Sequence, residues 1–203
     1  HLAQVVNGSR ESPSLDTGEP SVITSSPNGN YISGNPDGWT IVGGDGGITR
    51  LIPSDVSASG HAGETMAWLR DGAEMSQDVA GTIHAGDVYA LQLSIGYRQD
   101  LTPFPGGTVR LMATDGTNSI TLETLNLSTP PLGGWEALTL QTGPISAADA
   151  AAYPHLRIVI DTGPGEQQLL IDDVQLTTTS SITDQGSLGI NWGADDAVAY
   201  RSV

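Results

Sequence analysis

The fold class is decided by the stretch Val88–Arg98, which reads VYALQLSIGYR. Its leucines and isoleucine occupy every second position from Leu91, while Gln92, Ser94 and Arg98 occupy the other phase. Successive side chains of an extended strand point to opposite faces, so this alternation predicts a strand with one apolar face and one polar face. Such strands are typical of antiparallel sheets that bury only one face.

The same alternation recurs later in the chain, for example in Leu156–Ile160. The chain is also rich in turn-forming residues, with 26 Gly and 12 Pro. The sequence therefore predicts an all-β fold, an antiparallel two-sheet β-sandwich of the jelly-roll type. The predicted strands are Gln4–Val6, Trp39–Val42, Thr65–Leu69, Ala73–Asp78, Asp87–Arg98, Thr108–Thr114, Ser119–Leu127, Trp135–Gln141, His155–Asp161 and Gln168–Thr177.

Other stretches do not have the strand pattern. Ser146–Tyr153 predicts a short helix, because its first residue can cap it and a proline follows it. Asp16–Asp37 is rich in Pro, Asn, Gly and Ser and predicts a long loop. The predicted domain organisation is a sandwich over residues 1–178 and a Thr/Ser linker with a C-terminal tail over residues 179–203. The tail contains one more strand-like run, Leu188–Gly193, which indicates the start of a following domain.

The chain is strongly acidic: 23 Asp and Glu stand against 7 basic residues, all of them Arg, for a net charge of −16. Nucleic acids and anionic membrane surfaces attract basic proteins, so this composition argues against both as partners. No apolar run approaches the roughly 18 residues of a membrane span, so membrane insertion is not expected. The chain has no Cys, scattered His, and neither a nucleophile elbow nor a phosphate loop, which argues against a catalytic constellation.

Two acidic segments far apart in the chain need a physical explanation. Asp172 and Asp173 lie inside the apolar run Leu169–Leu176, and Glu11 lies near the start. A buried carboxylate costs several kcal/mol unless it is paired or coordinates a metal. Because the chain has no Lys, the expected partner is a hard cation such as Ca²⁺, which prefers oxygen ligands. Adjacent residues of a regular strand face opposite ways, so only one of the two aspartates is expected to face such an ion.

Several motifs carry a resemblance to a known group of domains. They are, in chain order, Val6-Asn7-Gly8-Ser9 with Glu11, Pro36-Asp37-Gly38-Trp39, Gly134-Trp135 and Ile171–Leu176. Over residues 4–178 they resemble the carbohydrate-binding-module-like jelly rolls of the galactose-binding-like superfamily in bacterial extracellular proteins. One departure is Arg10, where that superfamily usually has an aromatic residue. The resemblance implies an extracellular or cell-surface location and a structural Ca²⁺ held by Glu11 and Asp172, with backbone carbonyls completing the coordination.

The same end motifs resemble, more distantly, the cyanobacterial Stig cyclases, which build hapalindole-type indole alkaloids. That resemblance implies a carboxylic acid that triggers rearrangement and cyclisation, with Asp173 as the acid and Tyr97 as a neighbour. Such chemistry needs a carboxyl with a raised pKa in an apolar pocket, and aromatic rings around an indole cation. Aromatic residues make up only 5% of the chain and Phe occurs once, which argues against an aromatic cage.

The candidate ligand-binding residues are Tyr31, Tyr97, Arg98, Phe104 and Arg110. The aromatic residues lie in or beside loops, where a ligand surface is expected. Trp39 and Trp135 are expected to plug the ends of the sandwich, whereas the role of Trp68 stays open. Arg98, Arg110 and Arg157 either bind an acidic glycan together on one sheet face or pair with cross-strand carboxylates such as Asp161, and the acidic excess favours pairing.

The sequence therefore predicts a non-catalytic, calcium-stabilised carbohydrate-binding module of a secreted or surface protein, with a polysaccharide or glycan as its partner. Two alternatives stay open. One is a Stig-type cyclase that acts on an indole–terpene substrate through Asp173. The other is a structural or adhesive module that binds neither. The sequence does not indicate the oligomeric state.

Overall fold

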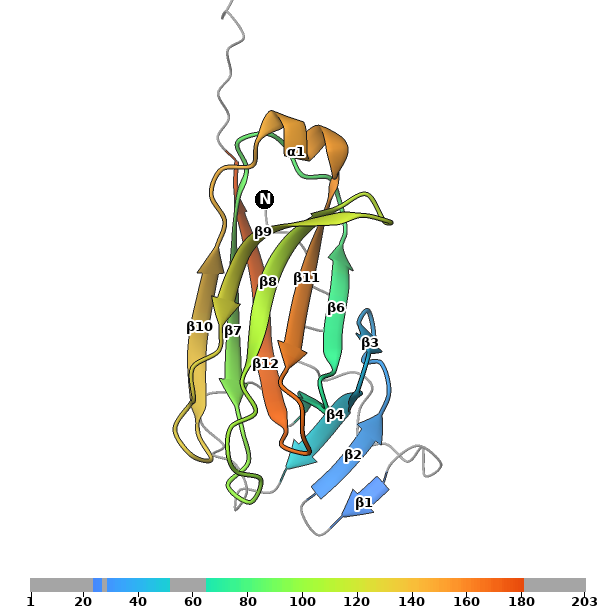
Figure 1. Cartoon of the computed structure of the whole chain (residues 1–203), viewed down its shortest axis with the longest axis vertical. Coiled ribbons are helices and arrows are strands. Elements are labelled where there is room, and N and C mark those ends of the chain that lie inside the picture. The colour runs from blue at the N-terminus through green and yellow to red at the C-terminus, as the bar shows by residue number, and fades with distance from the viewer. Residues whose placement is uncertain (1–23, 27–28, 52–64, 181–203) are drawn as a thin grey trace, which may run out of the picture.

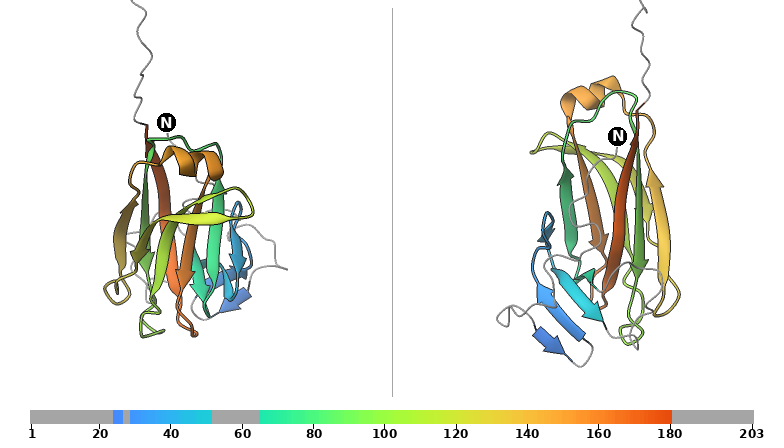
Figure 2. Two further views of the ribbon diagram at one scale, coloured as in Figure 1. Left: turned by 45° about the horizontal axis from the view of Figure 1, so that its top comes forward. Right: turned by 180° about the vertical axis from the view of Figure 1, so that it is seen from behind.

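The structure is a computed structural model that describes residues 24–26, 29–51 and 65–180. Its elements are β1 (Thr24–Ser26), β2 (Gly29–Ser33), β3 (Thr40–Val42), β4 (Asp45–Leu51), β5 (Met66–Arg70), β6 (Glu74–Val79), β7 (Val88–Gly96), β8 (Gly107–Thr114), β9 (Ser119–Asn126), β10 (Trp135–Gln141), α1 (Ala147–Ala152), β11 (His155–Thr162) and β12 (Leu169–Thr179). The strands form two sheets that pack face to face (Figures 1 and 2). The predicted all-β sandwich is therefore confirmed.

The larger sheet has the strand order β1-β2-β4-β5-β12-β7-β10, and the smaller has the order β3-β6-β11-β8-β9. Every pair of neighbouring strands is antiparallel in the described residues. β12, the last described strand, lies inside the larger sheet between β5 and β7. Asp172 and Asp173, which belong to β12, therefore lie in the middle of the larger sheet.

The core lies between the two sheets and follows the alternation seen in the sequence. Leu91, Leu93 and Ile95 of β7 are at most 2% exposed, and Ile158 and Ile160 of β11 are fully buried. All five belong to one cluster of apolar side chains that joins the sheets. Burying one side chain of this size contributes roughly 1.5–3 kcal/mol, so these positions fix which face of each strand points inward.

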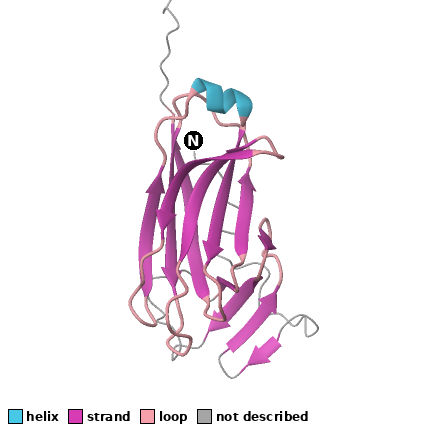
Figure 3. Ribbon diagram, in the orientation of Figure 1, coloured by secondary structure: helices cyan, strands magenta, loops and turns pink. Residues whose placement is uncertain are grey.

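The helix α1 lies at one end of the sandwich, and β1 and β2 lie at the other (Figures 1 and 3). The predicted cap is present, because the Oγ of Ser146 accepts a hydrogen bond from the N–H of Asp149 at 3.0 Å. In the described part of the chain, no helix has the length and apolar character needed to cross a membrane.

The strands differ from the predicted ones mainly near the start of the described residues. The predicted loop Asp16–Asp37 is wrong in its second part, because β1 and β2 form there, and β4 was not predicted. Gln4–Val6 and Leu188–Gly193 lie outside the described residues. The boundary predicted at residue 178 stays a prediction.

Candidate active site

The outer face of the larger sheet carries the side chains that alternate with the core. On β7, Ser94 lies between the core residues Leu93 and Ile95 and so points outward. Ser94 is paired with Ala137 of β10 on one side and with Asp172 of β12 on the other. Directly opposed residues of neighbouring strands share a face. Asp172 therefore lies on the outer face, although it is 0% exposed.

Asp173 occupies a β-bulge in β12. The pairing of β12 with β7 shifts between Asp172 and Gln175, and the backbone φ of Asp173 is +54°. The extra residue keeps Asp173 on the outer face, where its Oδ2 accepts a hydrogen bond from the Oγ of Ser94 at 3.4 Å. Its own N–H donates to the Oδ1 of Asp172 at 2.8 Å. The expectation that the two aspartates face opposite ways is therefore wrong, because the strand is not regular at this point.

Asp173 lines a hollow of about 400 Å³ on this face. Asp173 is half-buried, whereas Asp172 does not line the hollow. The lining residues are Gln92, Leu93, Ser94, Ala137, Leu138, Thr139, Asp173 and Gln175. Asp173 is thus the one of the two carboxyl groups that a bound molecule in this hollow can reach.

A second apolar cluster covers the neighbouring part of the same face. Met66 and Trp68 of β5 pack against Leu170 of β12, with the partly buried rings of Tyr31 and Trp135 beside them. The rings of Tyr31 and Trp68 meet edge to face, with centroids 6.0 Å apart. The main core does not contain these residues, so this face carries an apolar cluster of its own.

A smaller hollow, of about 180 Å³, lies at the edge of this cluster. Its lining residues are Tyr31, Ser33, Asp45, Thr49, Trp68, Arg70, Arg98 and Gln168. The guanidinium of Arg70 donates to Asp45 at 2.7 Å and lies 5.6 Å from the centre of the Trp68 ring. Arg98 is 8% exposed and donates from Nε to Asp100 at 2.8 Å, which holds the pKa of the Asp100 carboxyl below its ordinary value.

The structure brings together only some of the predicted ligand-binding residues. Tyr31 and Arg98 line the same small hollow. Tyr97 is buried and meets Phe104 edge to face at 5.4 Å, and neither ring lines the Asp173 hollow. Arg110 lies on β8 of the smaller sheet, where it donates to Glu74 at 2.7 Å and to Asp161 at 3.3 Å. Arg98 and Arg110 therefore do not share one sheet face, and Tyr97 does not line the hollow beside Asp173.

Sequence reasoning placed Ser94 on the polar phase of its strand but gave it no role, left the role of Trp68 open, and assigned Trp135 to the end of the sandwich. A signal for Trp68 was present, because it alternates with Ala67 and Leu69, which are both fully buried in the main core. Trp135 does not plug the end of the sandwich as predicted. Instead it packs against the outer cluster.

The predicted calcium site is only partly within the described residues. Glu11 lies outside them, so its pairing with Asp172 stays a prediction. No group of three or more His, Cys, Asp or Glu side chains in the described part could hold a metal ion. The buried carboxylate of Asp172 suits a hard cation, but the remaining oxygens must come from backbone carbonyls or from residues beyond the described ranges.

The family model described as HpiC1-like, HpiC1 cyclase, matches residues 1–177. Comparison with curated proteins gave no match. Among solved structures, the apo form of a cyclase from Fischerella sp. has a TM-score of 0.68 at 16% identity, covering 88% of this chain and 96% of that chain. The Stig cyclase Fisc from Fischerella sp. TAU, bound to (3Z)-3-(1-methyl-2-pyrrolidinylidene)-3H-indole, has a TM-score of 0.67 at 16% identity, with 89% and 98% covered.

A carbohydrate-binding module is also similar, at lower score. TmCBM61 in complex with β-1,4-galactotriose has a TM-score of 0.52 at 17% identity and covers 88% of this chain and 100% of that chain. Both resemblances stated from the sequence are thus confirmed at the level of the fold. The structures named above are all less than 25% identical to this chain, so they show only that the fold is shared. The assignment to a family rests on the match to the family model.

The prediction of a non-catalytic carbohydrate-binding module, and with it the prediction that the chain is not an enzyme, is wrong. The matching family is one of cyclases. The low aromatic content misled the prediction, because it averages over the whole chain, whereas Tyr31, Trp68 and Trp135 gather on the sheet face that also carries the Asp173 carboxyl group. The expected extracellular location stays a prediction. From the match over residues 1–177, this chain belongs to the HpiC1-like cyclase family.

Proposed function

We propose that this protein is an acid-initiated cyclase that acts on an indole–terpene substrate, with Asp173 as the acid. The observation that carries the proposal is the bulge in β12. It places an accessible carboxyl group on the same sheet face as the cluster of aromatic rings. Family membership and the likeness to cyclases crystallised with indole compounds support this reading.

The proposed reaction requires the protein to donate a proton to the substrate and to accept one back from the cyclised cation. The protonated carboxyl of Asp173 donates its proton to the substrate, which leaves a carbocation on the substrate and a carboxylate on the protein. A carbon–carbon double bond of the substrate then attacks the cation and closes the ring. Loss of a proton to the carboxylate of Asp173 restores the acid, so that the product is an isomer of the substrate. The Oγ of Ser94, which donates to Asp173, orients the carboxyl group during both transfers.

The aromatic cluster supplies an apolar surface for the indole end of the substrate. Aromatic rings pack against one another edge to face or offset-stacked, with centroids roughly 4.5–7 Å apart. Leu170, which packs against Trp68, lies three residues from Asp173 on β12, a distance of about 10 Å along an extended strand. An indole–terpene molecule is long enough to contact the rings with one end and the carboxyl group with the other.

The test is incubation of the purified protein with an isonitrile indole–terpene substrate, followed by chromatography and mass spectrometry for a cyclised isomer. Wild type is expected to give that isomer. Asp173→Asn is expected to lower the rate by roughly 10²–10⁴-fold, the usual contribution of a general acid. Asn tolerates the left-handed backbone of this position and keeps an oxygen that can accept from Ser94, so the fold is expected to survive.

Asp71→Asn is the matched control, because Asp71 also has a positive φ, of +59°, but lies in the exposed turn after β5. It is expected to keep the wild-type rate. An unchanged rate in Asp173→Asn would place the acid elsewhere. If wild type gives no cyclised product, the proposed substrate class is wrong.

We also propose that a calcium ion bound by Asp172 and Glu11 supports the site without taking part in the reaction. The buried position of the Asp172 carboxylate supports this assignment. When bound, the ion supplies positive charge that offsets this buried carboxylate. Asp172 accepts the N–H of Asp173, so holding the first carboxylate in place also fixes the backbone that presents the second.

A further inference from the structure

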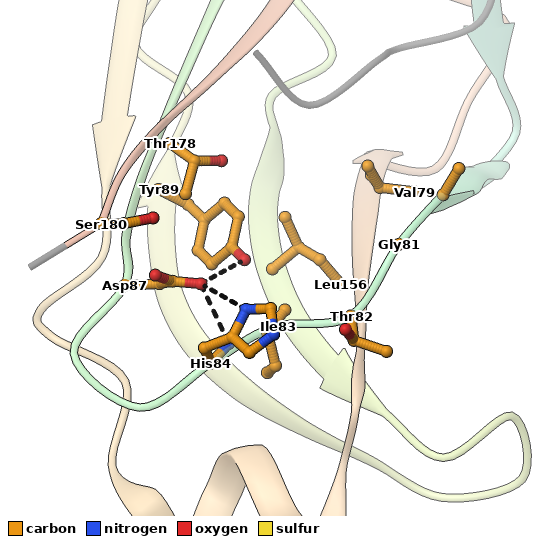
Figure 4. A pocket seen from close by; sticks show the side chains of 11 residues that line it. Val79, Gly81, Thr82, Ile83, His84, Asp87, Tyr89, Leu156, Thr178 and Ser180 are labelled. Carbon is orange, nitrogen blue, oxygen red and sulfur yellow. Dashed lines mark hydrogen bonds and ion pairs between the residues drawn. The ribbon is translucent and has the colours of Figure 1, made fainter. Parts of the chain in front are cut away.

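A third cavity lies at the α1 end of the sandwich and is lined by residues of both sheets (Figure 4). Its volume is about 280 Å³. Val79 of β6 and Leu156 of β11 line it from the smaller sheet, and Tyr89 of β7 and Thr178 of β12 line it from the larger. The loop between β6 and β7 forms the remaining wall. The cavity does not share a lining residue with either hollow of the candidate active site.

The acidic group in this cavity is the carboxylate of Asp87, which is 4% exposed. Its Oδ2 accepts from the backbone N–H of His84 at 2.9 Å and from the hydroxyl of Tyr89 at 3.2 Å. The Nδ1 of His84 lies 3.4 Å from the same oxygen. Figure 4 shows all three contacts converging on one oxygen. Within the described residues, Oδ1 of Asp87 has neither a hydrogen-bond nor an ion-pair partner.

The charge of Asp87 is poorly compensated by its neighbours. Tyr89 remains a neutral donor, because burial, and then the charge and hydrogen bond of Asp87, raise the pKa of its hydroxyl. His84 contributes a positive charge only when it is protonated, and its side chain is 74% exposed. No Arg side chain of the described residues lines the cavity. A buried carboxylate without a permanent cation beside it favours a ligand that brings one.

The rest of the cavity wall is mainly apolar. Val79, Ile83 and Leu156 are each at most 5% exposed and belong to the main core. They offer a surface for a hydrocarbon or aromatic group next to the carboxylate. The net charge of −16 on the chain also raises the local concentration of cations.

We propose that this cavity binds a small organic ammonium ion with an apolar or aromatic body. The ammonium group donates to Oδ1 of Asp87, and the body packs against Val79, Ile83 and Leu156. This site is separate from the proposed cyclase site and does not depend on the proposed reaction.

The first experiment needs no variant. Binding of 2-phenylethylammonium and of the neutral analogue 2-phenylethanol is measured on the full chain by calorimetry and by NMR shifts of the Tyr89 and His84 signals. The two probes have almost the same shape, so the difference between them isolates the charge. The ammonium is expected to bind saturably, to shift both signals, and to bind at least tenfold more tightly than the alcohol.

The second experiment removes the carboxylate charge. Asp87→Asn keeps the size of the side chain and an acceptor for the His84 N–H, and is expected to weaken ammonium binding at least tenfold. Glu166→Gln removes the same charge from an exposed turn between β11 and β12, and is expected to leave the affinity unchanged. Circular dichroism shows whether each variant is folded. If Asp87→Asn does not fold, the comparison of the two probes on wild type decides alone.

The proposal is overturned if wild type gives no saturable binding of the ammonium probe, or if the alcohol binds equally well. Equal losses of affinity for the ammonium probe in Asp87→Asn and Glu166→Gln also overturn the proposal, because the change in affinity would then follow from the net charge of the chain alone. Zinc chloride is titrated as well. If zinc displaces the ammonium probe at a zinc concentration below the Kd of the probe, the cavity is a metal site instead.

Discussion

At the scale of single residues, one backbone angle decides where the acid of this site points. Asp173 has a φ of +54°, a conformation that Asp, Asn and Gly adopt more readily than other residues. The alternation rule correctly placed Leu91, Leu93 and Ile95 in the core, but it fails at Asp173 because a bulge adds a residue to one strand only. The sequence around Asp173 contains no glycine or proline that signals such a bulge.

Gly96 is a second residue on which the site depends. A Cβ at this position would lie 2.8 Å from the carbonyl oxygen of Gly134 and 3.1 Å from the ring of Trp135. Gly96→Ala is therefore expected to push Trp135 away from the outer cluster and to lower the free energy of unfolding by about 1–3 kcal/mol, as overpacking usually does. Urea denaturation measures this change.

Gly143→Ala is the control for that experiment, because a Cβ there meets nothing within 4 Å. It is expected to leave the stability unchanged or to raise it by about 0.4–1 kcal/mol through the unfolded state. Equal destabilisation by both substitutions would show that the contact with Trp135 is not the cause.

At the scale of elements, most strands were predictable, including the short β3, whereas β1, β2 and β4 were not. β10 was predicted with its exact bounds, and β7 and β11 within a few residues, because their alternation is long and clear. β4 reads DGGITRL, and two glycines in a row weaken a strand pattern because they add no side chain to the alternation. In the structure a Cβ at Gly47 would collide with the carbonyl oxygen of Ile32, so glycine is present because the backbones of β2 and β4 approach closely.

The pairing of β6 with β11 carries a pH-dependent contribution to stability. The guanidinium of Arg157 donates to Asp78 at 2.9 Å and holds the pKa of the Asp78 carboxyl below its ordinary value of 3.8. A lowered pKa in the folded state stabilises the fold above the unfolded-state pKa, and the gain is lost as pH falls through the folded-state pKa. Because the Asp78 side chain is 53% exposed, the contribution is expected to be below about 1 kcal/mol.

Urea denaturation of wild type and Asp78→Asn checks this expectation. The difference in unfolding free energy between them is expected to be present at neutral pH and to disappear well below pH 3.8. Glu166→Gln serves as a reference without an ion pair in the described residues and is expected to show no such convergence. A difference for Asp78→Asn that grows as the pH falls would contradict the pairing.

At the scale of the whole molecule, composition predicted the class of fold but not the class of function. The all-β sandwich follows from alternation and turn residues spread over the entire chain. The cyclase site depends on which few aromatic residues share a face, and that depends on the order of strands in the sheet. Tyr31, Trp68 and Trp135 are far apart in the sequence and meet because β2, β5 and β10 belong to the same sheet. A single sequence does not specify that order.

The proposed calcium ion is also a property of the whole molecule, because it would join the start of the chain to its last strand. Chelation is expected to lower the melting temperature, since a bound ion contributes about 2–4 kcal/mol at concentrations 100- to 1,000-fold above its Kd. Calorimetry with and without a chelator measures the shift, and Glu11→Gln is expected to remove most of it. A melting temperature that does not respond to the chelator would exclude a structural ion.

The bulge in β12 has a consequence for how such a protein can arise. If Asp173 is removed from the sequence, Ile171 and Val174 remain inward, and Asp172 and Gln175 remain outward, in unbroken alternation against β7. The shortened strand therefore suits the same sandwich, now without an accessible carboxyl group on its outer face. Insertion or deletion of the single codon for Asp173 thus converts a sandwich without an accessible carboxyl group on its outer face into one with such a group, or the reverse. The evolutionary distance between a binding sandwich and an acid-bearing sandwich is therefore short.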